Sequence, residues 1–387
     1  MLNNFRARLS LVPKALSPFS VSMRIEPKAL ADFLRLGSAS ASGSIQQTGK
    51  NIRILAIAIA CVILVAPRFS NAFEEPQLVA GKKFRANDSL KPEPEQNADA
   101  QECLKGLCWE CEGFQVDLEP SDGKNGDWLV RFPSPVVSGD DINDRVAVEW
   151  YVAKDKNKIA MQAPAAVIVH ESGSGMTVGR VIASALGRKG VHAFMVQLPH
   201  YGHRRGPLGK PTGDGLVTAL KQGIMDVRRA RDAVACLPLV DRSRISLQGT
   251  SLGGFVASTT AGMDRSFHRV MLLLSGGDLH GVMMNGKKDA SKMRDELVKN
   301  GVSMDQMKEY LHTIEPLRLA HRIDPAKTWL FSGEFDDVVP LENAKILANK
   351  IPLDSSHHVI MPVDHYSGAL LLPSIVQQMF EQIVAPE

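Results

Sequence analysis

The chain of 387 residues lacks the features that would mark a membrane-embedded or nucleic-acid-binding protein. Its strongly apolar run, residues 54–66, has about 13 residues, whereas a helix that spans a bilayer needs about 20. A marked charge of one sign is also missing, because the formal net charge is only +3. The excess of basic residues lies in residues 1–72. The remainder is mildly acidic and therefore lacks the basic composition that is typical of a nucleic-acid-binding domain.

The N-terminal segment instead indicates export. Basic residues precede the apolar run 54–66, and the small residues of "SNA" follow it and end at Ala72, which is typical of a signal sequence. We therefore expect residues 1–72 to be removed and the protein to be periplasmic or secreted, without a stable membrane partner. An uncleaved anchor at residues 54–66 is the alternative, and the sequence leaves open whether translation starts at Met1 or Met23.

Cysteine is scarce, with five in the chain, four of which would remain after cleavage. Three of them stand in "CLKGLCWEC", where no further Cys or His supplies the ligands of a zinc site. An oxidising compartment permits disulfides, and short loops close at little entropic cost. We therefore expect at least one disulfide among Cys103, Cys108 and Cys111, with the pairing left open. We expect no metal site and no cofactor.

Residues 73–112 lack hydrophobic periodicity and include the polar stretch "KPEPEQNADAQE", which predicts a flexible linker that carries the cysteine cluster. The folded domain is expected at residues 113–387, and no internal repeat divides it. Its first strand-like runs are separated by turn residues and predict an antiparallel entry to a sheet. These runs are "FQVDL", "WLVRF" and "RVAVEWYVA".

Strands and helices alternate from Ala165 onward. The run "AAVIVH" is apolar throughout, as expected of a strand covered on both faces, and the helical pattern "TVGRVIASALGRKG" follows it. Repeated units of this kind predict an α/β fold with a mostly parallel sheet and helices on both faces. Residues 276–324 break the alternation with two helical patterns, and we expect them to form an inserted helical cap.

A serine stands at the junction between a predicted strand and a predicted helix. In "RISLQGTSLGGFVAS", Gly249 and Gly253 flank Ser251 in the pattern Gly-x-Ser-x-Gly. A sharp turn of this type exposes the serine oxygen and points helix N–H groups at developing negative charge. To act as a nucleophile, the serine hydroxyl also needs a base within hydrogen-bond reach.

An acid and a histidine follow at the ends of later strands. Asp336 and Asp337 come just after "TWLFSG", and His365 comes just after "HHVIMP". The carboxyl ends of parallel strands meet at one edge of a sheet, where α/β proteins place their sites. Serine, acid and histidine in this order therefore predict a site for nucleophilic catalysis.

Through "GTSLGG", "SGEFDDVVP" and "VDHYSG", most of the predicted domain resembles the α/β-hydrolase superfamily. It is most similar to the dienelactone-hydrolase, acyl-peptidase and prolyl-oligopeptidase-like branch of single-domain esterases. The resemblance implies an α/β-hydrolase fold, with Ser251 as nucleophile, Asp336 as acid and His365 as general base. Asp337 is the neighbour that the family pattern does not select, and Asp278 follows an earlier strand end that some relatives use for the acid.

The resemblance also implies an oxyanion hole made of two backbone N–H groups, those of Leu252 and Ser172. Relatives commonly have His-Gly after the strand that ends in "AAVIVH", whereas this chain has Glu171 in the position of the glycine. The loop after the next strand offers candidates for the substrate pocket. They are His200 and Tyr201, together with His203 and Arg204.

The leading interpretation is a serine hydrolase that cleaves a small-molecule ester through an acyl-enzyme. A serine peptidase is the first alternative, because amide hydrolysis uses the same triad. A non-catalytic binding module on the same fold is the second, and Glu171 is the feature that favours it. Nucleotide binding is disfavoured, because the strand "VHAFMVQLP" ends without the acidic residue that would hold a ribose. The sequence leaves the substrate and the oligomeric state open.

Overall fold

The computed structural model describes residues 78–207, 209, 211 and 214–386. The predicted targeting segment and its cleavage point after Ala72 lie outside the described residues. Within the described part of the chain, no helix is long and apolar enough to cross a membrane.

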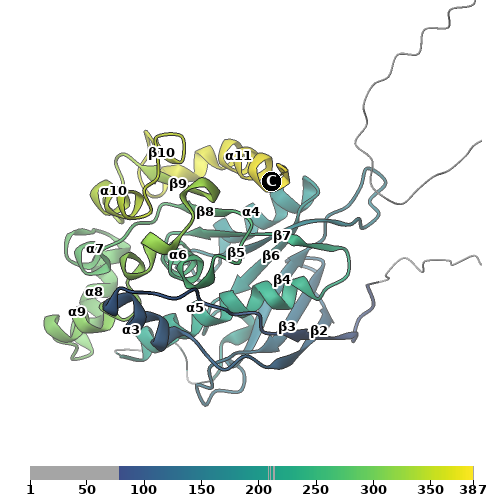
Figure 1. The fold of residues 1–387 in the computed structure, drawn as a ribbon, viewed down its shortest axis with the longest axis horizontal. Coiled ribbons are helices and arrows are strands. Elements are labelled where there is room, and N and C mark those ends of the chain that lie inside the picture. Colours follow the sequence, from purple (N-terminus) through teal and green to yellow (C-terminus); the bar gives the residue numbers. More distant parts are fainter. Residues whose placement is uncertain (1–77, 208, 210, 212–213, 387) are drawn as a thin grey trace, which may run out of the picture. The chain divides into compact units, whose positions relative to one another are not determined.

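A ten-stranded sheet runs through the domain (Figure 1), in the order β1-β2-β3-β4-β6-β5-β7-β8-β9-β10. Strands β1 to β4 form an antiparallel meander, β4 is antiparallel to β6, and the strands from β6 to β10 in this order are parallel. Both the antiparallel entry and the mostly parallel sheet that the sequence predicts are thus confirmed. The strands are β1 (Lys83–Asn87), β2 (Gly113–Pro120), β3 (Trp128–Pro133), β4 (Arg145–Tyr151), β5 (Ala163–Val169), β6 (His192–Gln197), β7 (Val240–Thr250), β8 (Val270–Leu273), β9 (Thr328–Gly333) and β10 (His358–Met361).

Helices cover both faces of the sheet. In chain order they are α3 (Ala98–Leu107), α4 (Thr177–Arg188), α5 (Asp214–Ala235), α6 (Leu252–Asp264), α7 (Leu279–Asn285), α8 (Asp289–Lys299), α9 (Met304–His312), α10 (Leu341–Lys350) and α11 (Leu372–Val384). Helices α5, α6 and α10 contribute to one apolar cluster, whereas α4 and α11 contribute to a second.

Strand β5 shows why the predicted core strands are apolar throughout. Val167 and Val169 pack in the first cluster, whereas Ala166 and Ile168 pack in the second. Successive side chains of a strand point to opposite faces, and both faces of this strand are covered. An alternating polar pattern would therefore bury polar groups on one face, and the continuous apolar run avoids that cost.

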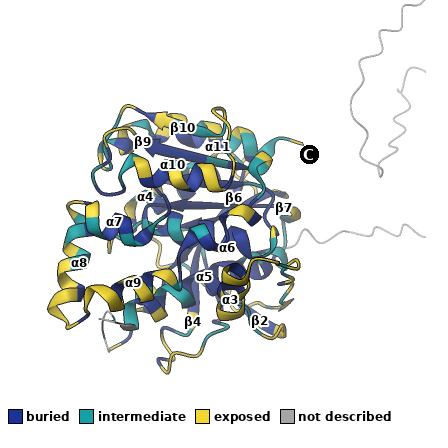
Figure 2. Cartoon of the chain, turned by 60° about the vertical axis from the view of Figure 1, so that its left-hand side comes forward, coloured by how far each residue is buried: buried dark blue, intermediate teal, exposed yellow. Residues whose placement is uncertain are grey.

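The segment between β8 and β9 holds helices α7, α8 and α9. Helices α8 and α9 coincide with the two predicted helices, and α7 is additional. Helix α9 begins with a capping box, in which Ser303 and Gln306 each accept a hydrogen bond from the other's backbone N–H group. Much of the surface of α8 and α9 is exposed (Figure 2), and their buried apolar contacts come from side chains such as Leu297, Met307 and Leu311.

The structure contradicts the prediction of a flexible linker at residues 73–112, as far as it describes that segment. Strand β1 pairs with β2 along its whole length. Helix α3 begins after Asn97, whose side chain accepts a hydrogen bond from the N–H group of Ala100. The buried face of this helix has ordinary helical spacing. It consists of Ala100, Cys103, Leu104 and Leu107.

The polar composition of this segment misled the prediction, because its charges have fixed partners in the domain. Asp88 forms an ion pair with Arg229 of α5 at 2.6 Å. Glu95 forms one with Arg322 at 2.8 Å. These arginines lie far along the chain. The composition of residues 73–112 alone therefore shows many charged residues, as in a solvated linker, but not the partners of those charges.

The four cysteines in the described part of the chain are free thiols, which contradicts the predicted disulfide among Cys103, Cys108 and Cys111. Cys103 is buried on the apolar face of α3, whereas the thiol of Cys111 donates a hydrogen bond to the carbonyl oxygen of Leu90 at 3.4 Å. Burial raises the pKa of both Cys103 and Cys108 to about 11. Because α3 directs Cys103 into the core, this thiol does not pair with its neighbours despite the short spacing along the chain.

Candidate active site

Ser251 occupies the turn between β7 and α6. Its φ of 51° and ψ of −116° are unusual for a residue with a side chain, and such backbone strain costs about 1–3 kcal/mol and is concentrated at functional sites. The backbone N–H group of Ser251 donates a hydrogen bond to the carbonyl oxygen of Leu273 in β8 at 2.8 Å. The neighbouring strand therefore helps to hold the turn in this conformation.

The two glycines that flank Ser251 are required by close packing. A Cβ atom at Gly249 would collide with the carbonyl oxygen of Gly253, and a Cβ atom at Gly253 would collide with the carbonyl oxygen of Val169 at the end of β5. Helix α6 can thus begin against the ends of β5 and β7 only if both positions lack a side chain. This explains the Gly-x-Ser-x-Gly pattern in physical terms.

A chain of two hydrogen bonds connects Ser251 to His365 and Asp336. Ser251 Oγ lies 3.0 Å from His365 Nε2, and His365 Nδ1 lies 2.7 Å from Asp336 Oδ2. Asp336 Oδ1 accepts hydrogen bonds from the N–H groups of Val338 and Val339, both at 2.9 Å. The loops after β7, β9 and β10 thus bring the predicted serine, acid and histidine together.

The other two candidate acids have different partners. Asp337 Oδ1 lies 3.1 Å from Nζ of Lys288. Asp278 caps α7, where its side chain accepts a hydrogen bond from the N–H group of Gly281 at 2.9 Å. Neither carboxylate contacts His365 by a hydrogen bond in the described structure.

The start of α8 contacts both of the loops that carry the acid and the histidine. Besides the contact between Lys288 and Asp337, the hydroxyl of Tyr366 donates a hydrogen bond to Asp289 Oδ2 at 3.0 Å. Partial burial and the carboxylate of Asp289 raise the pKa of Tyr366 to about 12, so this hydroxyl keeps its proton. These two contacts hold the start of α8 against the loops that carry Asp336 and His365.

The two candidate oxyanion donors belong to the loop after β5 and to the first turn of α6. Leu252 is the first residue of α6, and N–H groups in a first turn have no acceptor within their own helix. Ser172 follows β5, and its carbonyl oxygen accepts a hydrogen bond from the hydroxyl of Tyr201 at 2.8 Å. The loop that carries Ser172 is therefore tied to the loop after β6.

Glu171 has a structural explanation. Its carboxylate accepts hydrogen bonds from the N–H groups of Val178 and Gly179 at 3.0 and 3.1 Å, and so caps the first turn of α4. The N-cap residue itself, Met176, supplies no side-chain hydrogen bond. The departure from the His-Gly pattern thus replaces a missing helix cap.

His170, just before Glu171, is fully buried and joins the same two loops. Its Nε2 accepts a hydrogen bond from the N–H group of Leu198 at 3.1 Å, and its Nδ1 donates one to the carbonyl oxygen of Glu171 at 2.6 Å. Burial lowers the pKa of His170 to about 4, so the ring is neutral and can accept this bond. It acts as a fixed support for the loop after β5.

The four candidates in the loop after β6 have different positions. His200 and Tyr201 line a cavity that Leu252 also lines. Arg204 is fully buried and forms an ion pair with Asp226 at 2.7 Å, so it supports the loop rather than facing the pocket. His203 is exposed and is not among the residues that line the cavity.

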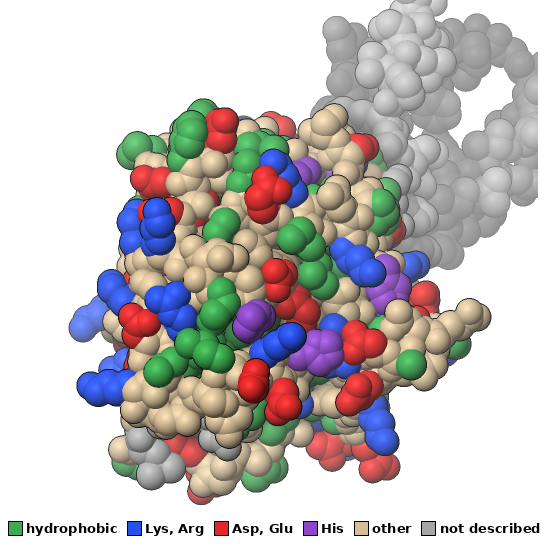
Figure 3. Space-filling model, turned by 90° about the vertical axis from the view of Figure 1, so that its left-hand side faces the viewer, with side chains coloured by type: hydrophobic (Ala, Val, Ile, Leu, Met, Phe, Trp, Pro, Cys, Tyr) green, Lys and Arg blue, Asp and Glu red, His purple; other side chains and the backbone are tan. Residues whose placement is uncertain are grey.

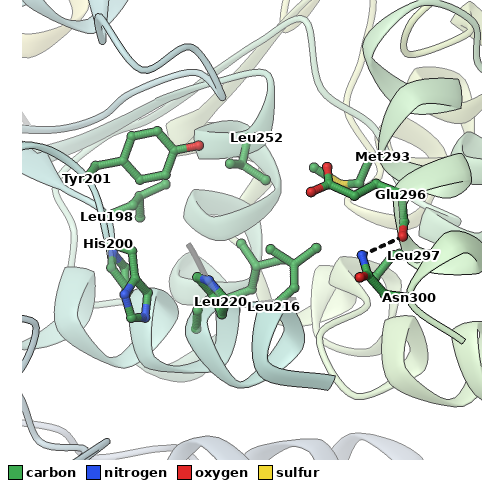
Figure 4. A pocket seen from close by; sticks show the side chains of 13 residues that line it. Leu198, His200, Tyr201, Leu216, Leu220, Leu252, Met293, Glu296, Leu297 and Asn300 are labelled. Carbon is green, nitrogen blue, oxygen red and sulfur yellow. Dashed lines mark hydrogen bonds between the residues drawn. The ribbon is translucent and has the colours of Figure 1, made fainter. Parts of the chain in front are cut away.

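Apart from Leu252, the residues that form the rest of this cavity were not predicted as site residues from the sequence (Figure 4). Leu216 and Leu220 come from α5, and Met293 and Leu297 come from α8. The i, i+4 spacing of Met293 and Leu297 indicates one apolar face of a helix. It does not indicate what that face covers, because the sequence does not say where the cap lies.

The arrangement around Ser251 can activate a hydroxyl by moving its proton to a histidine that a buried carboxylate orients. Across the ranges that the structure describes, no three His, Cys, Asp or Glu side chains gather closely enough to hold a metal ion.

Comparisons with known proteins agree with this architecture. Residues 219–368 match the model of the prolyl oligopeptidase family. Acetyl xylan esterase 1 from Thermoanaerobacterium sp. JW/SL YS485 has a similar structure, with a TM-score of 0.52, 17% identity, and coverage of 77% of this chain and 98% of that chain. The acetyl xylan esterase from Paenibacillus sp. R4 gives a TM-score of 0.50 at 16% identity, covering 74% of this chain and 97% of that chain. No curated protein matches the chain. The structural likeness confirms the fold class that the sequence predicts.

Proposed function

We propose that this chain is a serine hydrolase of the α/β-hydrolase superfamily, and that it hydrolyses carboxylic esters with Ser251 as nucleophile, His365 as general base and Asp336 as the orienting acid. The observation that carries the proposal is the pair of hydrogen bonds from Ser251 Oγ to His365 Nε2 and from His365 Nδ1 to Asp336 Oδ2, 3.0 and 2.7 Å long. Both bonds have the geometry that proton transfer from the serine requires.

The reaction proceeds in two halves. Ser251 Oγ attacks the ester carbonyl while His365 Nε2 takes its proton, and the tetrahedral intermediate collapses as His365 returns that proton to the departing alkoxide. A water molecule then attacks the acyl-enzyme with His365 as base again. The C–O bond to Ser251 breaks, the serine regains its proton, and the acid is released.

The negative charge on the tetrahedral oxygen needs two donors. The proposed donors are the backbone N–H groups of Leu252 and Ser172. The free first-turn position of Leu252 supports the first assignment, and the anchoring of Ser172 by Tyr201 supports the second. One such donor stabilises a transition state by about 3 kcal/mol.

Peptide hydrolysis is the second candidate function, and the match of residues 219–368 to the prolyl oligopeptidase family favours it. The same residues would act, with His365 protonating an amine in place of an alkoxide. Ester hydrolysis takes precedence because the cavity beside Ser251 is apolar and offers few groups that could recognise a peptide backbone.

The test is the turnover of p-nitrophenyl butyrate by the wild type and by Ser251→Ala. The variant should lose about four to six orders of magnitude in kcat, because such triads act as a unit. A fluorophosphonate probe should label the wild type once, on the peptide that contains Ser251. Turnover by the variant, or labelling at Ser172 or Ser275, would reject the assignment, and a wild type without activity or labelling would favour the binding module.

Export is part of the same proposal. The basic residues before the apolar run 54–66 and the small residues that end at Ala72 support it. Sequencing the N-terminus of the protein isolated from cells should find Phe73 first. A protein that begins at Met1 or Met23 would contradict cleavage.

A further inference from the structure

An apolar cavity of about 120 Å³ lies beneath the cap, beside the proposed nucleophile. The body of the domain contributes Leu198 and Leu220, and the cap contributes Met293 and Leu297 (Figure 4). The polar residues Glu296 and Asn300, which also line it, are exposed and therefore mark its outer end.

A second cavity of about 70 Å³ adjoins the first, and all residues that line it are apolar. The two cavities share Leu220, Leu252 and Met293. The inner cavity reaches Val282 of α7 and Leu311 of α9, so every cap helix contributes to the combined apolar space.

Two residues that line this space belong to, or contact, the segments that would handle the substrate carbonyl. Leu252, which lines both cavities, directly follows Ser251. Tyr201, which lines the outer cavity, holds the carbonyl oxygen of Ser172 through its hydroxyl. An acyl group on Ser251 Oγ would therefore lie beside this apolar space.

A larger, more open pocket at α7 and α9 is lined mainly by polar and charged side chains, among them Asp305, Lys308 and Glu309. Figure 3 shows basic and acidic side chains interspersed with small apolar patches on this side of the molecule. Neither basic nor acidic side chains dominate this face, so it does not favour a substrate of one charge. The buried space is therefore the better site for an apolar group, because its inner part is lined by apolar residues alone.

We propose that the two cavities bind the acyl chain of the substrate, and that the enzyme acts on esters of medium-chain acids. An apolar cavity of about 150 Å³ accepts benzene, so the combined space corresponds to a chain of roughly six to eight carbons. The lining of the inner cavity disfavours a polar acyl group, because hydroxyls buried there would lack hydrogen-bond partners. This inference rests on the proposed ester hydrolysis and names its substrate class.

The first experiment measures kcat/KM for p-nitrophenyl acetate, butyrate, hexanoate, octanoate and dodecanoate. Each added methylene that enters the cavity should raise kcat/KM about fourfold, up to hexanoate or octanoate. Dodecanoate should fall below octanoate, because its chain exceeds the space. A maximum at acetate would overturn the inference while leaving ester hydrolysis intact.

The second experiment changes the volume of the inner cavity. Val282→Phe fills it and should lower the ratio of kcat/KM for octanoate to kcat/KM for acetate at least tenfold. Leu311→Ala enlarges it and should move the optimum to a longer chain. The matched control is Val298→Phe, the same substitution on the same cap at a residue with 44% exposure, which should leave the chain-length profile unchanged.

The outcomes separate the two proposals. If no ester is hydrolysed and no fluorophosphonate labels Ser251, the proposed function itself fails. If esters are hydrolysed but neither Val282→Phe nor Leu311→Ala changes the ratio of octanoate to acetate turnover, the acyl-chain site is wrong. If Val282→Phe disturbs folding, seen as an acetate loss with a lowered melting temperature, the shift produced by Leu311→Ala decides.

Discussion

At the residue scale, Asp336 and Asp337 are chemically identical neighbours with different surroundings. Asp336 is buried and its two oxygens accept three hydrogen bonds, one of them from His365. Asp337 instead faces Lys288 of the cap. Consecutive side chains in a turn point in different directions, so only one of the two can orient the histidine.

We predict that Asp336→Asn lowers kcat for a p-nitrophenyl ester by about 10⁴-fold. The amide would favour the tautomer of His365 that carries its proton on Nε2, which cannot accept the proton of Ser251. Steady-state kinetics measures the change. Asp337→Asn, the same substitution one residue later, is the control and should change kcat by less than about fivefold, as should Asp278→Asn. A larger loss in either control would reassign the acid.

At the scale of elements, the segment before β2 is fastened to the domain by charge pairs. Glu95 accepts hydrogen bonds from the N–H group of Asn97, from Arg322 and from His321. The hydrogen bond from the Asn97 backbone, followed by those from Arg322 and His321, lowers the pKa of Glu95 to about 2. A lowered folded-state pKa stabilises the fold at pH values above the ordinary pKa of the group.

We predict that Glu95→Gln lowers the free energy of unfolding at pH 7 by about 1 kcal/mol, since solvent screens pairs near the surface. The difference from wild type should persist down to about pH 4.5 and shrink as the pH falls from there toward 2, where the wild-type carboxylate gains its proton. Urea unfolding at pH 7, 5 and 3.5 measures it. Glu93→Gln, at an exposed carboxylate 3.8 Å from Arg265, is the control and should show no such trend.

At the scale of the whole molecule, the described part of residues 78–112 belongs to the folded domain. Strand β1 extends the sheet, and α3 buries an apolar face against the rest of the core. Asp88 also neutralises Arg229, whose side chain is 1% exposed. Removing one partner of a buried pair typically costs about 3–5 kcal/mol.

We therefore predict that a chain of residues 113–387 is insoluble, or unfolds far below the melting temperature of a chain of residues 73–387. The comparison requires soluble yield and thermal unfolding followed by circular dichroism. The longer chain is the control and should be as stable as the protein isolated from cells. Equal stability of both chains would mean that β1, α3 and the Asp88 pair contribute little to the fold.

Local pattern alone determined much of this protein. The order of strands and helices, the two glycines that allow the turn at Ser251, and the placement of Asp336 and His365 at strand ends follow from periodicity and from steric limits that act within a few residues. Only the tertiary structure decided which aspartate contacts the histidine, because both follow the same strand and differ in direction alone.

The tertiary structure also decided features that depend on partners distant in the chain. The segment that resembles a linker is ordered because arginines from later helices and turns neutralise its carboxylates. Cys103 remains a free thiol because α3 turns it into the core. The apolar cavity beside Ser251 exists because α5 and the cap helices meet there, and their meeting is a property of packing that no single stretch of sequence contains.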